Sequence, residues 1–207
     1  MTITNTVPTN NKAIAITFDD GPNPIYTPQV LEIFANAGGK ATFFMIGEKM
    51  EKYPEIVRMA KEKGHQIGNH TYTHADLSKL SVEELKEEIK RTEELIQELT
   101  GEMPHVLRPP FLLFNEETVA IAEENGYPMI GALNLDARDW EQPGVNHILE
   151  ESRKHVKEGS ILIFHDGYGD RSQTIEAISK LVPELTEKGF QLVTVSELLT
   201  LSNSNKQ

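Results

Sequence analysis

No cysteine occurs among the 207 residues of this chain, so neither disulfide bonds nor thiolate metal sites are available to it. Any metal ion must therefore be held by histidine, aspartate or glutamate side chains, by backbone oxygens or by water. The sequence also contains no run of about 18 consecutive apolar residues, which excludes a helix that spans a membrane.

Positive charge is scarce as well. The 20 lysines and arginines are outnumbered by 32 aspartates and glutamates, which gives a formal net charge of -12 at pH 7. An acidic chain is poorly suited to the phosphate backbone of nucleic acids, so we exclude nucleic acid as its main partner. Much of the acidic excess lies between Glu83 and Glu98, where we expect the solvated face of a helix.

Both ends of the chain are polar. Residues 1–12 lack the basic segment followed by an apolar one that marks a secretory signal. We therefore expect flexible tails at residues 1–12 and 201–207 around one domain at residues 13–200, and we expect that domain to be a monomer. The sequence as it stands indicates a cytoplasmic protein, or an extracellular or cell-wall protein whose export signal has been removed.

Short apolar segments alternate with amphipathic ones along the whole chain. Six amphipathic segments stop at a glycine, the residue that most readily takes the left-handed conformation at the end of a helix. Ser81 and Glu84 have the spacing of a capping box at the start of the longest helix. Strands rich in branched and aromatic residues are predicted between the helices, at residues 13–18, 41–46, 65–68, 105–108, 129–134, 160–164 and 191–195.

Repetition of a strand–helix unit predicts an α/β fold with a parallel sheet. Several strands are apolar at successive positions, as residues 161–164 show, which is typical of strands that are buried on both faces. Such a sheet can be open and doubly wound, or closed into a barrel. About seven units in roughly 180 residues favour closure, so we predict a distorted (β/α) barrel with about seven parallel strands.

Polar residues gather where the predicted strands end. In parallel α/β folds the carboxyl ends of the strands meet at one rim, and that rim is where active sites are built. One such cluster could arise by chance, but five on one rim indicate a functional site. The clusters are Asp19 with Asp20, His70 with His74, Arg108, Asp136 with Asp139 and Trp140, and His165 with Asp166.

Two of these clusters have the composition of a metal site. Asp19 and Asp20 leave a strand in different directions, so one can bind a cation while the other faces a water or a substrate. The alternative is an aspartate that merely opens a Gly-Pro turn. His70 and His74 can both reach one cation at about 2.0–2.1 Å, although two unrelated surface histidines would show the same spacing. Two histidines and one aspartate leave ligand positions open, as a catalytic metal requires.

The other rim residues admit two interpretations each. Arg108 could hold a carboxylate through a forked hydrogen bond, or it could form an ordinary surface ion pair. Trp140 is the only tryptophan, and core packing alone could explain it. His165 follows a buried strand, where a structural role is common, but its place beside the other polar clusters favours a proton carrier.

Five short segments together resemble carbohydrate esterase family 4, the polysaccharide deacetylases with a NodB-homology domain. They occur in the family's order: TFDDGP at 17–22, HTYTH at 70–74, RPPF at 108–111, DARDW at 136–140 and ILIFHD at 161–166. The family fold is a distorted (β/α) barrel, in agreement with the strand pattern. The third motif of the family usually reads RPPYG, whereas Phe111 and Leu112 replace the tyrosine and the glycine in this chain.

The resemblance implies a metal site with a neighbouring base. Asp20, His70 and His74 would hold one divalent metal, zinc in the first place and cobalt or nickel as alternatives. Asp19 would be the base that takes a proton from water. Arg108 would orient Asp19 and keep it ionised.

The resemblance also implies an acid and a substrate pocket. His165 would protonate the departing amine, and Asp139 would help His165 to stay protonated. The oxyanion of the tetrahedral intermediate would be stabilised by the metal and by the backbone N–H of Phe111. Trp140 and Ile163 would wall the pocket that receives the acetyl methyl group.

The function that follows is a metal-dependent hydrolase that removes N-acetyl groups from N-acetylglucosamine units of chitin oligomers or peptidoglycan. An O-acetyl esterase acting on acetylxylan, or a hydrolase of small amides or imides, is the alternative within enzymes. A carbohydrate-binding module without metal is the alternative outside enzymes, and it predicts missing ligands, whereas all of them are present.

Overall fold

The computed structural model describes residues 3–203. Its strands are β1 (Ala13–Gly21), β2 (Thr42–Met45), β3 (Gln66–Asn69), β4 (Ile161–His165) and β5 (Gln191–Leu192). Its α-helices are α1 (Tyr26–Ala37), α2 (Gly47–Lys52), α3 (Pro54–Glu62), α4 (Val82–Thr100), α5 (Glu116–Glu124), α6 (Val145–Arg153), α7 (Ser172–Glu187) and α8 (Val195–Asn203). Short 3-10 turns lie in the connections, at Leu77–Lys79, Pro110–Leu112, Leu135–Ala137 and Asp139–Glu141.

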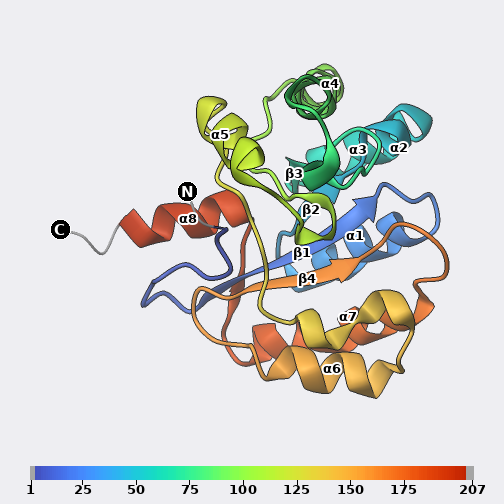
Figure 1. The fold of residues 1–207 in the computed structure, drawn as a ribbon. Helices are drawn as coiled ribbons and strands as arrows, with labels where there is room; N and C mark the ends of the chain where they lie inside the picture. Colours follow the sequence, from blue (N-terminus) through green and yellow to red (C-terminus); the bar gives the residue numbers. More distant parts are fainter. Residues whose placement is uncertain (1–2, 204–207) are drawn as a thin grey trace.

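The strands form one parallel sheet in the order β3-β2-β1-β4, and β5 pairs with the start of β1. The α/β class and the parallel sheet are therefore confirmed. The arrowheads of β1 and β4 point to the same side of the molecule, while α6 and α7 lie together below the sheet (Figure 1). Among the helices of residues 3–203, none has the length and apolar character needed to cross a membrane.

Residues 3–203 contain five strands, so the structure does not bear out the predicted count of about seven. The predicted strands at residues 105–108 and 129–134 are reduced to isolated parallel bridges around Leu107. Prolines flank both segments, at positions 104, 109, 110 and 128, and a proline has no N–H with which to extend a ladder. Hydrogen bonding nevertheless continues past them, because the N–H of Leu133 donates to the carbonyl of Ile161 in β4 at 3.0 Å.

Strand β1 distributes its side chains over two faces by alternation. Ile14, Ile16 and Phe18 belong to the core that the sheet forms with the helices. The intervening residues are small or polar and lie on the opposite face: Ala13, Ala15, Thr17 and Asp19. Alternation therefore brings a carboxylate to the end of the strand on the face opposite α1 and α7.

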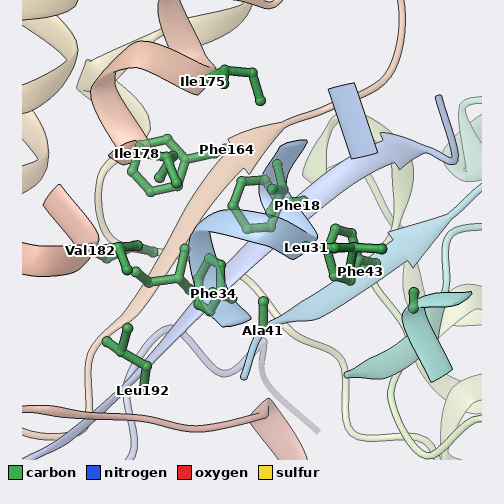
Figure 2. Packing of buried hydrophobic residues seen from close by; sticks show 14 of the residues in the cluster. Phe18, Leu31, Phe34, Ala41, Phe43, Phe164, Ile175, Ile178, Val182 and Leu192 are labelled. Carbon is green, nitrogen blue, oxygen red and sulfur yellow. The ribbon is translucent and has the colours of Figure 1, made fainter. Parts of the chain in front are cut away.

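A cluster of phenylalanines forms the centre of the core. The ring of Phe18 lies 5.3 Å from Phe43 of β2, 6.0 Å from Phe34 of α1 and 6.1 Å from Phe164 of β4, measured between centroids (Figure 2). A second cluster fills the other face of the sheet near the start of the strands, where α8 packs against it. Helix α8 accordingly lies at the opposite end of the molecule from the arrowheads (Figure 1). The core thus fixes β1, β2 and β4 relative to one another and leaves their carboxyl ends open.

The N-terminal segment packs against the domain. The N–H of Thr4 donates to the carbonyl of Met129 at 2.9 Å, and Val7 is only 2% exposed. These contacts differ from the free tail expected for residues 1–12. Parts of the two predicted tails, residues 1–2 and 204–207, lie outside the described residues.

The helix ends follow the signals in the sequence. The side chain of Ser81 accepts from the N–H of Glu84, and the Glu84 carboxylate accepts from the N–H of Ser81, so the capping box is confirmed. The six glycines predicted to close helices all have positive φ angles, between 64° and 81°. Only Gly159 lies well beyond its helix, because α6 ends at Arg153.

His65 is a buried histidine whose titration should affect stability. It is 3% exposed, lies between the rings of Phe34 and Phe43, and accepts a hydrogen bond from the N–H of Ala41 at 3.0 Å. Burial lowers the pKa of His65 to about 4, from the value of 6.5 expected in the unfolded chain. Between these two pH values the unfolded chain binds a proton that the folded protein does not.

We therefore expect the free energy of unfolding to fall as the pH decreases from about 6.5 to about 4, with His65 contributing roughly 2–3 kcal/mol of that loss. Urea unfolding at several pH values in this range measures the slope. The variant His65→Asn keeps a hydrogen-bond acceptor but does not titrate, so its slope should be shallower. Equal slopes in the two proteins would show that His65 is not responsible.

Candidate active site

The carboxyl ends of β1, β3 and β4 open into a pocket of about 880 Å³. Arg108 and Asp139 are fully buried behind it and contact two of its lining residues. The five polar clusters predicted along the rim therefore meet at one site. Eight of the ten predicted site residues line the pocket directly: Asp19, Asp20, His70, His74, Phe111, Trp140, Ile163 and His165.

Asp20, His70 and His74 form a cluster that can hold a metal ion. Their candidate ligand atoms all lie within 4.8 Å of one another, and no other such group of three occurs among residues 3–203. Oδ1 of Asp20 lies 3.0 Å from Nε2 of His74 and 3.5 Å from Nε2 of His70. This oxygen is buried and has no hydrogen-bond partner among the described residues, as expected for an atom whose partner is a cation.

The protonation of the cluster also suits a cation. Burial alone would raise the pKa of Asp20, but the neighbouring imidazoles of His70 and His74 outweigh burial and hold that pKa well below its usual range. Nδ1 of His70 lies 2.7 Å from the carbonyl of Arg108. A carbonyl can only accept, so Nδ1 carries a hydrogen, and in the neutral imidazole the lone pair is then on Nε2, the atom that faces Asp20. The cluster therefore presents an anionic oxygen and an imidazole lone pair to the same point.

The loop that carries the two histidines is held by a carboxylate of α4. Glu88 accepts hydrogen bonds from the N–H groups of Tyr72 and Thr73, both at 2.8 Å, and from the Thr73 hydroxyl at 2.7 Å. The expectation that the acidic residues of this helix form only a solvated face is therefore wrong for Glu88. The sequence contains no signal that separates Glu88 from its acidic neighbours, because the contact depends on where the loop docks.

Arg108 and Asp19 form a buried ion pair. Nη1 of Arg108 lies 2.6 Å from Oδ1 of Asp19 and also donates to the hydroxyl of Thr17 at 2.7 Å. Nε and Nη2 donate to the carbonyls of Ile130 and Gly131 at 3.0 and 2.8 Å. The forked hydrogen bond considered from the sequence is therefore not formed, and the surface ion pair is excluded. The guanidinium spreads its donors over four acceptors and fixes Asp19 through one of them.

His165 and Asp139 form a second pair at the pocket. Nδ1 of His165 lies 2.8 Å from Oδ1 of Asp139, while Oδ2 of Asp139 accepts from the N–H of His165 and the hydroxyl of Thr174. Burial alone would lower the pKa of His165, but the charge and hydrogen bond of Asp139, followed by the charges of Asp19 and Asp20, raise it to about 9. His165 therefore carries a proton at neutral pH.

The third motif keeps a left-handed turn despite its altered sequence. Phe111 and Leu112 have φ angles of 57° and 56°, so leucine occupies a backbone conformation that suits glycine better. Such a conformation costs a residue other than glycine roughly 1–2 kcal/mol. The ring of Phe111 is exposed and packs on His74, with 4.6 Å between ring centroids.

Several lining residues lie outside the predicted set, among them Leu135, Tyr168 and Arg171. Leu135 directly precedes the predicted rim segment at residues 136–140, and Tyr168 and Arg171 follow the segment that ends at Asp166. Their proximity to these motifs is the only signal that the sequence offered for them. Asp166, by contrast, belongs to a predicted cluster but is fully buried. Burial raises its pKa to about 7, and its carboxylate accepts from the hydroxyl of Thr27.

Comparison with known proteins agrees with this arrangement. The sequence profile of the polysaccharide deacetylase family matches residues 6–130. A peptidoglycan-N-acetylglucosamine deacetylase of Bacillus cereus is 44% identical over 194 residues, which cover 93% of this chain and 91% of that protein. A chitooligosaccharide deacetylase of a Bradyrhizobium species is 32% identical, with 90% of each chain covered.

A solved structure extends the likeness to three dimensions. The crystal structure of a peptidoglycan N-acetylglucosamine deacetylase in complex with 4-naphthalen-1-yl-N-oxidanyl-benzamide is similar with a TM-score of 0.89 at 33% identity, covering 94% of this chain and 91% of that one. The resemblance drawn from the five motifs is confirmed by a profile, by relatives of nearly equal length and by a shared fold. This chain belongs to the polysaccharide deacetylases, carbohydrate esterase family 4.

Proposed function

We propose that the protein is a metal-dependent deacetylase that hydrolyses N-acetyl groups of N-acetylglucosamine-containing polymers, either peptidoglycan or chitin oligomers. One observation carries the proposal: a cluster of metal-ligating atoms, a buried carboxylate–arginine pair and a protonated histidine–carboxylate pair all serve one pocket. The activities named for the two relatives support the substrate class.

The ligand set suits a divalent metal of the zinc type, with cobalt or nickel as alternatives, because it combines imidazole nitrogen and carboxylate oxygen. Asp20 would contribute a carboxylate oxygen, and His70 and His74 would contribute Nε2. Bound there, the ion would polarise the acetamide carbonyl and lower the pKa of a coordinated water toward neutrality.

The side chains of this protein supply a base and an acid to the reaction. Asp19, held in place by the guanidinium of Arg108, takes a proton from the attacking water. The backbone N–H of Phe111 donates a hydrogen bond to the oxyanion of the tetrahedral intermediate. His165 gives its proton to the nitrogen as the bond to the acetyl carbon breaks, because an unprotonated amine is a very poor leaving group. The products are acetate and a free amine on the sugar.

The remaining predicted residues shape the pocket and the domain. Trp140 packs against His165, with 5.2 Å between ring centroids, and would form the acetyl pocket together with Ile163. We assign the activity to a single monomeric domain at residues 13–200. We also propose that its sheet is a distorted barrel, and the hydrogen bond from Leu133 to β4 supports closure on that side.

The base assignment predicts that Asp19→Asn abolishes turnover, by at least about 10²-fold in kcat, while the metal content stays unchanged. Asparagine removes the proton acceptor but leaves Asp20, His70 and His74 in place. Acetate release and metal content, measured on the same sample, check both parts. His70→Ala is the matched control and should lose metal and activity together. Near-full activity in Asp19→Asn would show that another group is the base.

The function itself is tested by metal removal and a substrate panel. Treatment with a chelator should abolish acetate release, and zinc or cobalt should restore it. The panel contains chitin oligomers, peptidoglycan fragments, acetylxylan and a small amide. We expect N-acetylglucosamine substrates to be cleaved fastest. Preference for acetylxylan would favour an O-acetyl esterase, and a protein that takes up no metal and hydrolyses nothing would favour a carbohydrate-binding module.

The acid assignment predicts a specific pH dependence. His165 must be protonated to act, so kcat should fall as the pH rises through the pKa of His165. Despite burial, Asp139, Asp19 and Asp20 raise this pKa to about 9, and a bound cation would bring it down from that value. Asp139 is the strongest influence that raises this pKa, so Asp139→Asn should move the basic limb of the profile down by at least about one pH unit. The profile of kcat against pH for the two proteins measures the shift. An unmoved basic limb would contradict the assignment.

A further inference from the structure

Large apolar side chains that remain exposed are concentrated at the active-site pocket. Residues 3–203 contain eight of them, and four line this pocket. An exposed apolar patch with a polar surround is typical of a ligand-binding groove. Of the four, Phe111 and Trp140 belong to the predicted site, whereas Leu135 and Tyr168 have no part in metal binding or proton transfer.

Tyr168 differs from Leu135 in that several contacts hold its ring in place. Nζ of Lys49 lies 3.1 Å from the centroid of the ring, and the ring of His74 packs against it with 5.9 Å between centroids and 63° between planes. Its backbone has a φ of 52°, a conformation that a tyrosine adopts only when its surroundings impose it. The residue is nevertheless 46% exposed. Tyr168 is therefore a fixed aromatic surface that remains open to the pocket.

The position of this surface is tied to the metal cluster. The ammonium of Lys49 that covers part of the ring also donates to the backbone carbonyl of Asp20 at 2.8 Å. Tyr168 thus contacts one candidate metal ligand, His74, directly and a second, Asp20, through Lys49. A molecule that packs on Tyr168 is held at a defined place relative to the reacting acetamide.

The pocket has two other exposed aromatic residues. Phe111 packs on His74, as Tyr168 does, whereas Trp140 packs on His165. Since the acetyl group occupies the side of Trp140 and Ile163 in the proposed function, Tyr168 meets a different part of the substrate. The C–H face of a pyranose ring is flat and apolar enough to pack on a tyrosine, and its hydroxyls can remain in water.

We propose that Tyr168 is a carbohydrate-binding residue whose ring packs on the sugar unit next to the one that is deacetylated. This inference rests on the proposed function. It predicts that the protein acts on oligomers better than on a single N-acetylglucosamine, because a single sugar cannot occupy the reacting position and reach Tyr168 at the same time. Tyr168 then sets the preference for chain length without taking part in the chemical step.

The experiment compares the metal-loaded wild-type protein with Tyr168→Ala and Tyr168→Phe on N-acetylglucosamine and its oligomers of increasing length. Tyr53→Ala is the matched control, because Tyr53 also lies under a lysine, with Lys52 Nζ 5.2 Å from its centroid, but does not line the pocket. The measured quantities are KM and kcat for each length, the metal content and the hydrolysis of p-nitrophenyl acetate.

We expect Tyr168→Ala to raise KM for the longer oligomers by about 2- to 12-fold, the scale of one aromatic contact. Its kcat, metal content and ester hydrolysis should change by less than about twofold, Tyr168→Phe should restore KM, and Tyr53→Ala should behave as wild type. An unchanged KM at every length would overturn the inference, as would an equal loss on all substrates, which indicates a structural role. Wild-type protein that cleaves no acetylated sugar would overturn the proposed function itself.

Discussion

The site depends on the burial of one guanidinium. Arg108 is 0% exposed, and an ion taken out of water costs several kcal/mol unless charge and hydrogen bonds compensate for it. Asp19 supplies the charge, and Thr17 and two carbonyls supply the remaining acceptors. The same residue supports the metal cluster, because its backbone carbonyl takes the hydrogen bond from Nδ1 of His70. Through its side chain and its backbone, Arg108 therefore places the base and orients a metal ligand.

Two buried ion pairs hold the proposed base and the proposed acid. Asp19 is paired with the guanidinium of Arg108, and His165 is paired with Asp139, which favours an imidazolium. Asp19 and Asp20 also raise the pKa of His165, but a cation bound at Asp20 offsets their attraction. Asp139 is the larger influence that raises the pKa of His165. The acid can therefore keep its proton when the metal is present.

The placement of the site could be predicted because it follows from strand direction. Alternation along β1 brings Asp19 to the rim, and the parallel direction of the strands brings His70 and His165 to the same rim. The positions of the strand ends in the sequence were therefore enough to predict that these residues lie together. What could not be predicted depends on docking between segments. Glu88 serves the histidine loop only because α4 lies beside that loop.

The predicted number of strands was too high for a local reason that is visible in the sequence. The segments at residues 105–108 and 129–134 have strand-like composition, but prolines at positions 104, 109, 110 and 128 limit the N–H groups available for a ladder. The same interruption frees the backbone after Arg108 for a left-handed turn, in which Phe111 approaches His74. Eight residues other than glycine have positive φ angles within residues 3–203, and six of them line the pocket: Asp20, His74, Phe111, Leu112, Arg138 and Tyr168. Strain of this kind persists only where surrounding structure imposes it. The well-packed sheet and helices therefore stabilise a rim in which several residues have unfavourable backbone conformations. In the proposed function, the side chains of this rim converge on a cation and a sugar.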